Sequence, residues 1–328
     1  MVAVSNDFPP TAPFEHWYGL PEGDATCTVT SFSPASLALP EKWAIHPCGD
    51  TINRHPVLTT LIRHDPTGKL ALFDLSLGKT WKEYIEPGTE DQYDMFDAKV
   101  DKDLDQVLKE GGVKAEDVEL IVLSHNHFDH TGVPSLFPNA SILVGPSELP
   151  RIAALKGHSN AKELSWHGSP TRLAAFEHSY DVFGDGSFVL VSAQGHTPGH
   201  LAALIRTSSK PSAGEDKCEG EYVLLAADCA HHPTLVSLKP ADSHYTLGRW
   251  REPGDSLDEV PKHSNYEDWP VAAATLERVK ACHRREEVMV VLAHNFEQWE
   301  KWGAGKDGWG VELNGWRKKG MKWRQGMA

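Results

Sequence analysis

The chain has 328 residues, of which 40% are hydrophobic and 24% charged, and its formal net charge is −14. This composition is typical of a globular protein with a large core, and so negative a surface disfavours binding to nucleic acids and to anionic membranes. The apolar runs are far shorter than the roughly 20 residues of a membrane helix, and no secretory signal is visible. The 5 Cys are scattered without a CxxC pair, which predicts reduced thiols in a cytoplasmic protein.

The first third of the chain predicts an irregular N-terminal arm followed by strands. Residues 1–25 are rich in Pro, Gly and aromatic residues and have no periodicity. Apolar runs over 27–32, 57–63 and 70–75 predict strands, and the turn residues at 65–68 predict that the last two form a hairpin. Apolar residues at helical spacing over 98–110, ended by two glycines, predict a helix.

The rest of the chain alternates short apolar runs with turns. We expect strands over 119–124, 141–144, 188–192, 201–206, 222–227 and 288–293, and a helix over 269–283. The polar insert 208–220 predicts an exposed hairpin tip, and residues 229–270 predict a long cover segment. The chain ends in a basic tail over 303–328. We therefore expect one domain over 1–328, with the arm, the cover and the tail added to it.

A cluster of potential metal ligands directly follows the predicted strand 119–124. The segment reads Ser-His-Asn-His-Phe-Asp-His-Thr-Gly, and its ligand types are His125, His127, Asp129 and His130. Strand side chains alternate between faces, so the first two imidazoles are expected to point the same way. Four ligands so close in sequence cannot all bind one small ion. The spacing instead suits two adjacent metals, the first two residues at one and the last two at the other.

Three further ligand types lie where other predicted strands end. His196 follows the strand 188–192, Asp228 follows 222–227, and His294 follows 288–293. The carboxyl ends of strands are where α/β proteins assemble their sites. A carboxylate such as Asp228 can bridge two cations, and this His/Asp donor set suits zinc first, with iron or manganese as other candidates.

This pattern resembles the metallo-β-lactamase fold superfamily, whose signature is HxHxDH followed by a distant His, a bridging Asp and a last His. The resemblance covers residues 26–300 and implies an α/β fold, the four-layer αββα sandwich. It also implies that His125, His127 and His196 hold one metal, that Asp129, His130 and His294 hold the other, and that Asp228 bridges them.

The resemblance implies a dinuclear zinc hydrolase. Two close metals lower the pKa of a shared water to about 7, and the resulting bridging hydroxide attacks a carbonyl carbon. Asp129 would orient this hydroxide and help to pass its proton. The acidic surface disfavours the nucleic-acid-processing branch, and Asp228 stands where penicillin-type enzymes of the dinuclear cysteine class have a Cys. Two alternatives within the fold remain: a thioesterase that acts on hydroxyacyl-glutathione, and a mononuclear iron dioxygenase.

The remaining similarity is to lactonase-like and lactamase-like members. The HNHFDH string, with Phe128 between the ligands, is similar to that of N-acyl homoserine lactonases, which often place a Tyr three residues after the bridging Asp. Here that position is His231, which either replaces the Tyr as a donor or acid or makes a structural hydrogen bond in the loop. Fungal lactamases that open benzoxazolinone-type cyclic carbamates are similar in length and kind.

We therefore expect the substrate to be a small ring, namely a lactone, a lactam or a cyclic carbamate. The cover segment offers aromatic and imidazole side chains that could contact such a ring, and we expect no nucleic-acid or membrane partner and either a monomer or a homodimer. Besides Phe128, the candidate substrate contacts are His244, Tyr245, Trp250 and Tyr266.

Overall fold

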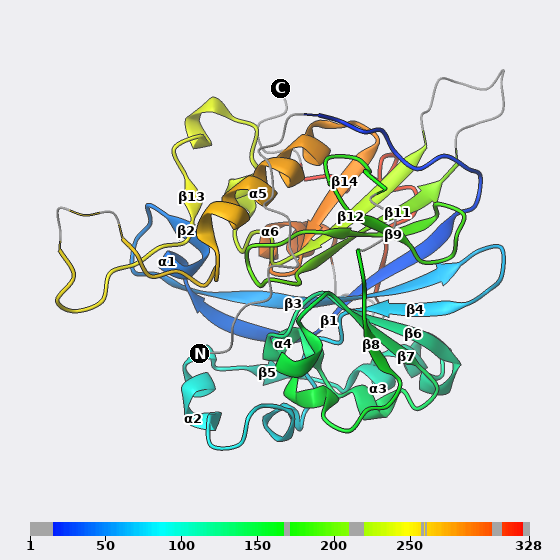
Figure 1. Cartoon of the computed structure of the whole chain (residues 1–328), viewed down its shortest axis with the longest axis horizontal. Coiled ribbons are helices and arrows are strands. Elements are labelled where there is room, and N and C mark those ends of the chain that lie inside the picture. The colour runs from blue at the N-terminus through cyan, green and yellow to red at the C-terminus, as the bar shows by residue number, and fades with distance from the viewer. Residues whose placement is uncertain are drawn as a thin grey trace.

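The computed structural model describes residues 16–166, 171–209, 220–256, 259, 261–303 and 310–323. Two β-sheets face each other within this part of the chain, and helices cover their outer faces (Figure 1). The predicted hairpin is present, because β3 (Ile52–His64) and β4 (Leu70–Phe73) pair as antiparallel neighbours.

The first sheet contains eight strands in the described part of the chain. Its path is β15 (Val311–Glu312), β1 (Cys27–Pro40), β3, β4, β6 (Val118–Leu123), β7 (Ser141–Val144) and β8 (Ala161–Glu163), and β5 (Lys99–Val100) pairs with β1. The strands from β4 to β8 are parallel neighbours, so their carboxyl ends lie at one edge of the sheet.

The second sheet has five strands among the described residues, and a small two-stranded sheet lies apart from it. The order is β14 (Val288–Leu292), β12 (Glu221–Ala227), β11 (Leu201–Ser208), β10 (Phe188–Ser192) and β9 (Ser179–Asp181). The two-stranded sheet pairs β13 (Thr246–Leu247) with β2 (Ile45–His46). β12 and β14 are parallel, whereas β10, β11 and β12 alternate in direction.

Alternating strand side chains fill three apolar layers. Val122 of β6 packs between the two sheets, while its neighbour Leu123 packs on the outer side with α3. In the same way Ile205 of β11 points between the sheets and Leu204 points towards α5. Because both faces of these strands are buried, their sequences are continuous apolar runs. The resulting helix–sheet–sheet–helix order confirms the predicted αββα sandwich (Figure 1).

The helices lie mainly on the two outer faces. They are α1 (Glu41–Ala44), α2 (Glu90–Tyr93), α3 (Leu104–Glu110), α4 (Phe128–Thr131), α5 (Trp269–Arg284) and α6 (Phe296–Lys301). α5 matches the predicted helix, and it begins at a side-chain cap in which Asp268 accepts a hydrogen bond from the backbone N–H of Val271. No helix in the described ranges is long and apolar enough to cross a membrane.

One segment differs from the prediction. The expected helix over 98–110 is wrong at its start, because Lys99 and Val100 pair with β1 as a strand and the helix begins only at Leu104. The described part of the basic tail contributes β15 to the first sheet and buries Trp316 completely. In the described part of the N-terminal arm, Trp17 lies against the guanidinium of Arg285.

Candidate metal centre and active site

The first group of predicted ligands lies in the loop and short helix that follow β6. This strand ends at Leu123, so His125 and His127 lie beyond it. Strand alternation was therefore the wrong reason to expect these two imidazoles together. The loop nevertheless brings their rings to a centroid distance of 4.6 Å. α4 begins directly after His127, with Asp129 in its first turn and His130 in its last.

The remaining predicted ligands follow strands of the second sheet. His196 lies in the loop between β10 and β11, Asp228 directly follows β12, and His294 lies just beyond β14. Ala227, the last residue of β12, has a φ of 43°, so the chain turns sharply before Asp228. Such left-handed conformations cost energy in residues with a Cβ and cluster at functional sites. Since β12 and β14 are parallel neighbours, Asp228 and His294 emerge at the same edge of the sheet.

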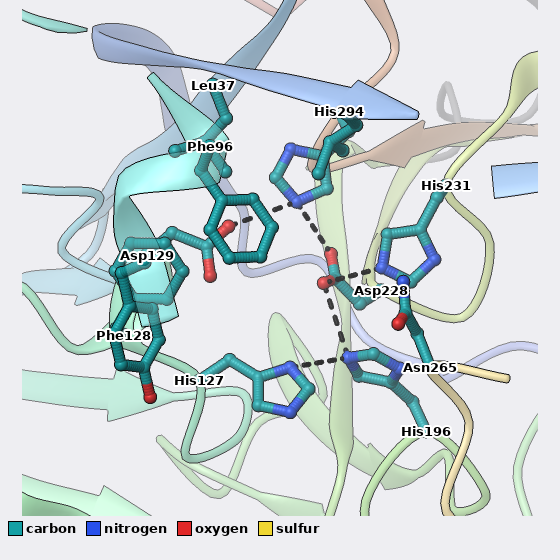
Figure 2. A pocket seen from close by; sticks show the side chains of 12 residues that line it. Leu37, Phe96, His127, Phe128, Asp129, His196, Asp228, His231, Asn265 and His294 are labelled. Atoms are coloured by element: carbon teal, nitrogen blue, oxygen red, sulfur yellow. Dashed lines mark hydrogen bonds and ion pairs between the residues drawn. The ribbon is translucent and has the colours of Figure 1, made fainter. Parts of the chain in front are cut away.

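The seven predicted ligands meet in space. Their donor atoms include two groups in which all the atoms lie within 4.8 Å of one another: His125, His127, His196 and Asp228, and Asp129, His130 and His294. Oδ1 of Asp228 lies 3.3 Å from Nε2 of His294, and its Oδ2 lies 3.4 Å from Nε2 of His196 (Figure 2). The carboxylate of Asp228 therefore stands between the two groups, where a bridging ligand would be needed.

Contacts behind the cluster fix the orientation of the imidazoles. Nδ1 of His130 lies 2.8 Å from Oδ2 of Asp74, and Nδ1 of His294 lies 2.9 Å from the carbonyl oxygen of Pro56. With Nδ1 engaged on the outer side of each ring, Nε2 is left to face the cluster. This is the usual arrangement of histidines that bind metals.

Asp74 is a functional residue that the sequence analysis did not single out. It directly follows β4, and its carboxylate accepts hydrogen bonds from the backbone N–H of Ser124 at 2.6 Å and from the Ser124 hydroxyl at 2.8 Å. The same hydroxyl lies 2.9 Å from Nδ1 of His125. The signal that could have found it was its position, because Asp74 follows an apolar strand as the predicted ligands do.

Burial and charge act in opposite directions on the imidazoles. Burial lowers the pKa of His125 and of His196 well below the usual value, and neighbouring imidazoles act in the same direction. Burial also disfavours a charge on His130, but the carboxylates of Asp228 and Asp129 outweigh it and raise the pKa of His130 well above its usual value. The two lowered pKa values favour the neutral imidazoles, the form that binds metals.

The donor set fits divalent cations. Nε2 of His125 is buried and makes no hydrogen bond in the part of the chain that the structure describes. Nδ1 of His127 and Nε2 of His196 face each other at 2.9 Å. Buried carboxylates and imidazoles crowded in this way need compensating charge, and two cations would supply it. Nitrogen and carboxylate donors suit Zn²⁺.

A cavity of about 340 Å³ opens above the cluster. It is lined by Leu37, Leu39, Tyr93, Phe96, His127, Phe128, Asp129, His196, Asp228, His231, Asn265 and His294. Leu37, Phe96 and Phe128 lie on one side with Asp129 beside them, and Asp228, His196 and His231 lie on the other (Figure 2). No Lys or Arg occurs among these lining residues, all of which are described.

The apolar side of the cavity is built from aromatic rings. The ring of Phe128 lies 4.6 Å from that of Tyr93 and 5.3 Å from that of Phe96, measured between centroids. Trp81 supports Phe128 from behind at 5.2 Å. Phe128 thus lines the cavity from the ligand motif itself, and its contact with a substrate stays a prediction.

His231 also faces the cavity, and Tyr266 lies behind it. Nε2 of His231 is 3.1 Å from Oδ2 of Asp228, and its Nδ1 is 2.7 Å from the hydroxyl of Tyr266. Tyr266 is only 4% exposed and does not line the cavity. It is therefore placed to orient His231 and not to touch a substrate, which differs from the contact that we expected.

The structure does not bring three other candidate contacts to the cavity. Trp250 packs on the ring of Trp43 at 5.5 Å, and His244 is exposed with its ring 4.1 Å from that of Tyr245. None of Trp250, His244 and Tyr245 is among the lining residues. Of the described residues of the cover segment, only His231 and Asn265 reach the cavity wall, and the sequence offered no pattern that marked Asn265.

Comparisons with known proteins agree with this site. The sequence profile of the metallo-beta-lactamase superfamily matches residues 52–210. The gamma-lactamase MBL2 of Gibberella moniliformis is 32% identical over 178 residues, which cover 49% of this chain and 70% of that protein. The cytochrome P450 monooxygenase mpaDE' of Penicillium brevicompactum is 31% identical over 207 residues, or 56% of this chain, but the chain spans only 23% of its length.

A solved structure has the same fold. The crystal structure of a quorum-quenching N-acyl homoserine lactone lactonase superimposes with a TM-score of 0.58 over 85% of this chain and 96% of that chain, at 19% sequence identity. This likeness concerns the fold alone, whereas the profile and the gamma-lactamase relate the sequences themselves. The chain therefore belongs to the metallo-beta-lactamase superfamily.

Proposed function

We propose that this protein is a dinuclear zinc hydrolase that opens a small, uncharged cyclic ester or amide. The observation that carries the proposal is the convergence of all seven ligand positions in one cluster, five of which line the cavity. The kinship with a gamma-lactamase supports a ring amide as one substrate class.

The lining of the cavity favours an uncharged substrate. The described lining residues contain no cationic side chain, and the whole chain carries a net charge of −14. A glutathione thioester carries carboxylates that would need basic contacts, so the cavity argues against that alternative. The aromatic rings of Phe96 and Phe128 suit a flat or apolar ring instead.

His125, His127 and His196 would hold one zinc ion, and Asp129, His130 and His294 the other, with Asp228 between them. When bound, the ions supply Lewis-acid activation of water and of the carbonyl group.

Side chains of the site position the substrate and transfer protons during ring opening. The water oxygen bonds to the carbonyl carbon as the bond from this carbon to the ring oxygen or nitrogen breaks. A carboxylate oxygen of Asp129, on the cavity wall, accepts the proton of the water and delivers it to the departing ring atom. His231 is held at Nδ1 by Tyr266, and its Nε2, which contacts Asp228, would turn to an oxygen atom of the substrate.

Metal analysis and a substrate screen test this proposal together. We expect about two zinc ions per chain. We also expect hydrolysis of lactones, lactams or cyclic carbamates, and little hydrolysis of glutathione thioesters. The Asp129→Asn and His127→Ala variants should lose this activity. One iron per chain, or full activity in these variants, would contradict the proposal.

A further inference from the structure

Asn265 presents a free carboxamide to the cavity. It is half-buried and lines the wall opposite Phe96 and Phe128 (Figure 2). Its amide makes no hydrogen bond to any described residue of the chain, and it belongs to neither group of predicted metal ligands. A polar group in this position is available to a bound molecule.

The backbone that follows Asn265 is bonded to the ligand loop. The backbone N–H of Tyr266 donates to Oγ of Ser264 at 3.2 Å, and that of Glu267 donates to the carbonyl oxygen of His196 at 3.2 Å. Asn265 is therefore held at a set position relative to the ligand loop that carries His196. Such fixed groups lose little entropy when they bind a ligand.

A carboxamide supplies what metal cations cannot. Cations attract lone pairs, so they recognise the carbonyl oxygen of a ring, but they cannot accept a hydrogen bond from an N–H group. The carboxylates of Asp129 and Asp228 could accept one, but both are predicted metal ligands. The oxygen of Asn265 is a neutral acceptor that lines the same cavity.

We propose that Asn265 accepts a hydrogen bond from the ring N–H of the substrate and so selects lactams and cyclic carbamates over lactones. This inference rests on the proposed function and sharpens it. In such rings the N–H lies directly beside the carbonyl carbon, so one molecule can place its carbonyl at the cluster and its N–H towards Asn265. A lactone of the same shape leaves the carboxamide oxygen without this partner, and sites built to bind an N–H discriminate strongly against analogues that lack it.

Three ring substrates of one skeleton test the inference. They are benzoxazolinone, its N-methyl derivative, and the benzofuranone lactone in which a CH₂ group replaces the N–H. We expect kcat/KM of zinc-loaded wild type to be highest for the N–H ring. Asn265→Leu replaces the carboxamide with an apolar group of similar size. In this variant kcat/KM for the N–H ring should fall about tenfold to a hundredfold, while kcat/KM for the other two rings should stay the same.

Two further variants separate the acceptor from other groups. Asn265→Asp keeps an acceptor oxygen and loses the donor, so its preference for the N–H ring should persist. Tyr93→Phe removes a hydroxyl group that also lines the cavity and serves as the matched control. The inference would be overturned if Asn265→Asp lost the preference for the N–H ring. It would also be overturned if Tyr93→Phe lost this preference while Asn265→Leu retained it.

Binding gives a readout that does not require turnover. The cyclic urea benzimidazolone resists hydrolysis, and its affinity can be compared by calorimetry with that of its N,N′-dimethyl derivative. We expect wild type to bind the N–H form about tenfold more tightly and Asn265→Leu to bind both alike. The role of Asn265 would be refuted if wild type bound benzimidazolone and its dimethyl derivative with equal affinity. It would also be refuted if wild type and Asn265→Leu had the same ratio of kcat/KM for the N–H ring and the lactone. Either result would leave the proposed function standing. A protein that opens none of the rings would refute the proposed function as well.

Discussion

Asp74 connects residues that would bind metal but does not face the cavity itself. Its carboxylate contacts the ring of His130 and two groups of Ser124, whose hydroxyl in turn contacts His125. One buried side chain thus orients an imidazole of each predicted metal position. Such outer contacts commonly control metal affinity by about 10-fold to 100-fold.

Replacement of Asp74 should therefore weaken metal binding more than it weakens the fold. In Asp74→Asn, the amide cannot hold the ring of His130 as the carboxylate does, and we expect zinc affinity to fall about 10-fold to 100-fold. Competition with a chromogenic chelator measures this affinity. The control is Asp65→Asn, an exposed carboxylate that accepts hydrogen bonds from Thr26 and Thr28 far from the cluster. Equal zinc affinity in both variants would count against the role of Asp74.

Glu148 is a buried carboxylate whose pKa gives a pH-dependent prediction. Burial raises this pKa, against the opposing hydrogen bond from the N–H of Gly199. Because the folded pKa lies above the unfolded value, the charge destabilises the folded state, and stability falls as pH rises from the unfolded pKa of about 4.3 through the folded one. Glu148→Gln keeps an acceptor without the charge. It should melt at a higher temperature than wild type at pH 8, and this difference should shrink towards pH 5.

A second variant of Glu148 separates charge from hydrogen bonding. Glu148→Ala leaves the N–H of Gly199 without its acceptor, so at pH 5 it should be less stable than wild type by about 1–3 kcal/mol. At pH 8 the removal of the buried charge should offset part of this loss. Thermal unfolding at pH 5 and pH 8 with the same zinc concentration measures both variants. A Gln variant that is less stable than wild type at pH 8 would show that the ionised carboxylate stabilises the fold.

At the scale of elements, the strands with two buried faces were predictable and the short pairing strands were not. β6, β10, β12 and β14 each contain an apolar run, so the sequence alone marked them and the ligand types that follow them. β5 and β15 have two residues each and depend on pairing with β1. The apolar wall of the cavity combines residues that follow no pattern, such as Leu37 and Tyr93, and only tertiary packing brings them together.

The loop that carries His196 is seated directly on α5, and Gly195 makes this possible. A Cβ at Gly195 would lie 2.2 Å from the backbone nitrogen of Ala272, and the φ of this glycine is +121°. Gly195→Ala should therefore cost more than about 3 kcal/mol and weaken zinc binding by displacing His196. Urea unfolding and a zinc titration measure the two effects.

The matched control is a glycine with a positive φ but open space around it. Gly157 has a φ of +85°, and no atom lies within 4 Å of the position that a Cβ would take there. Gly157→Ala should therefore cost only the backbone strain of about 1–2 kcal/mol. Equal losses of stability in the two variants would show that strain, and not the contact with α5, makes Gly195 necessary.

For the whole molecule, the cluster joins the two sheets at one edge. His125, His127, Asp129 and His130 follow a strand of the first sheet, whereas His196, Asp228 and His294 follow strands of the second. The N–H of Leu201 and the carbonyl oxygen of Ser124 connect the same two segments by a backbone hydrogen bond. Cations bound between the sheets would therefore act as a cross-link in addition to their chemical role.

Metal removal should consequently destabilise the entire sandwich. A ligand that binds only the folded state at about 1,000 times its Kd stabilises that state by about 4 kcal/mol, so chelation should lower Tm by several degrees and restored zinc should reverse the change. His294→Ala, which removes a ligand from the second sheet, should show a smaller response to zinc. If Tm of the wild type is the same with chelator and with excess zinc, the cluster does not bind zinc in the folded protein, and the bridge between the sheets must consist of the apolar layer alone.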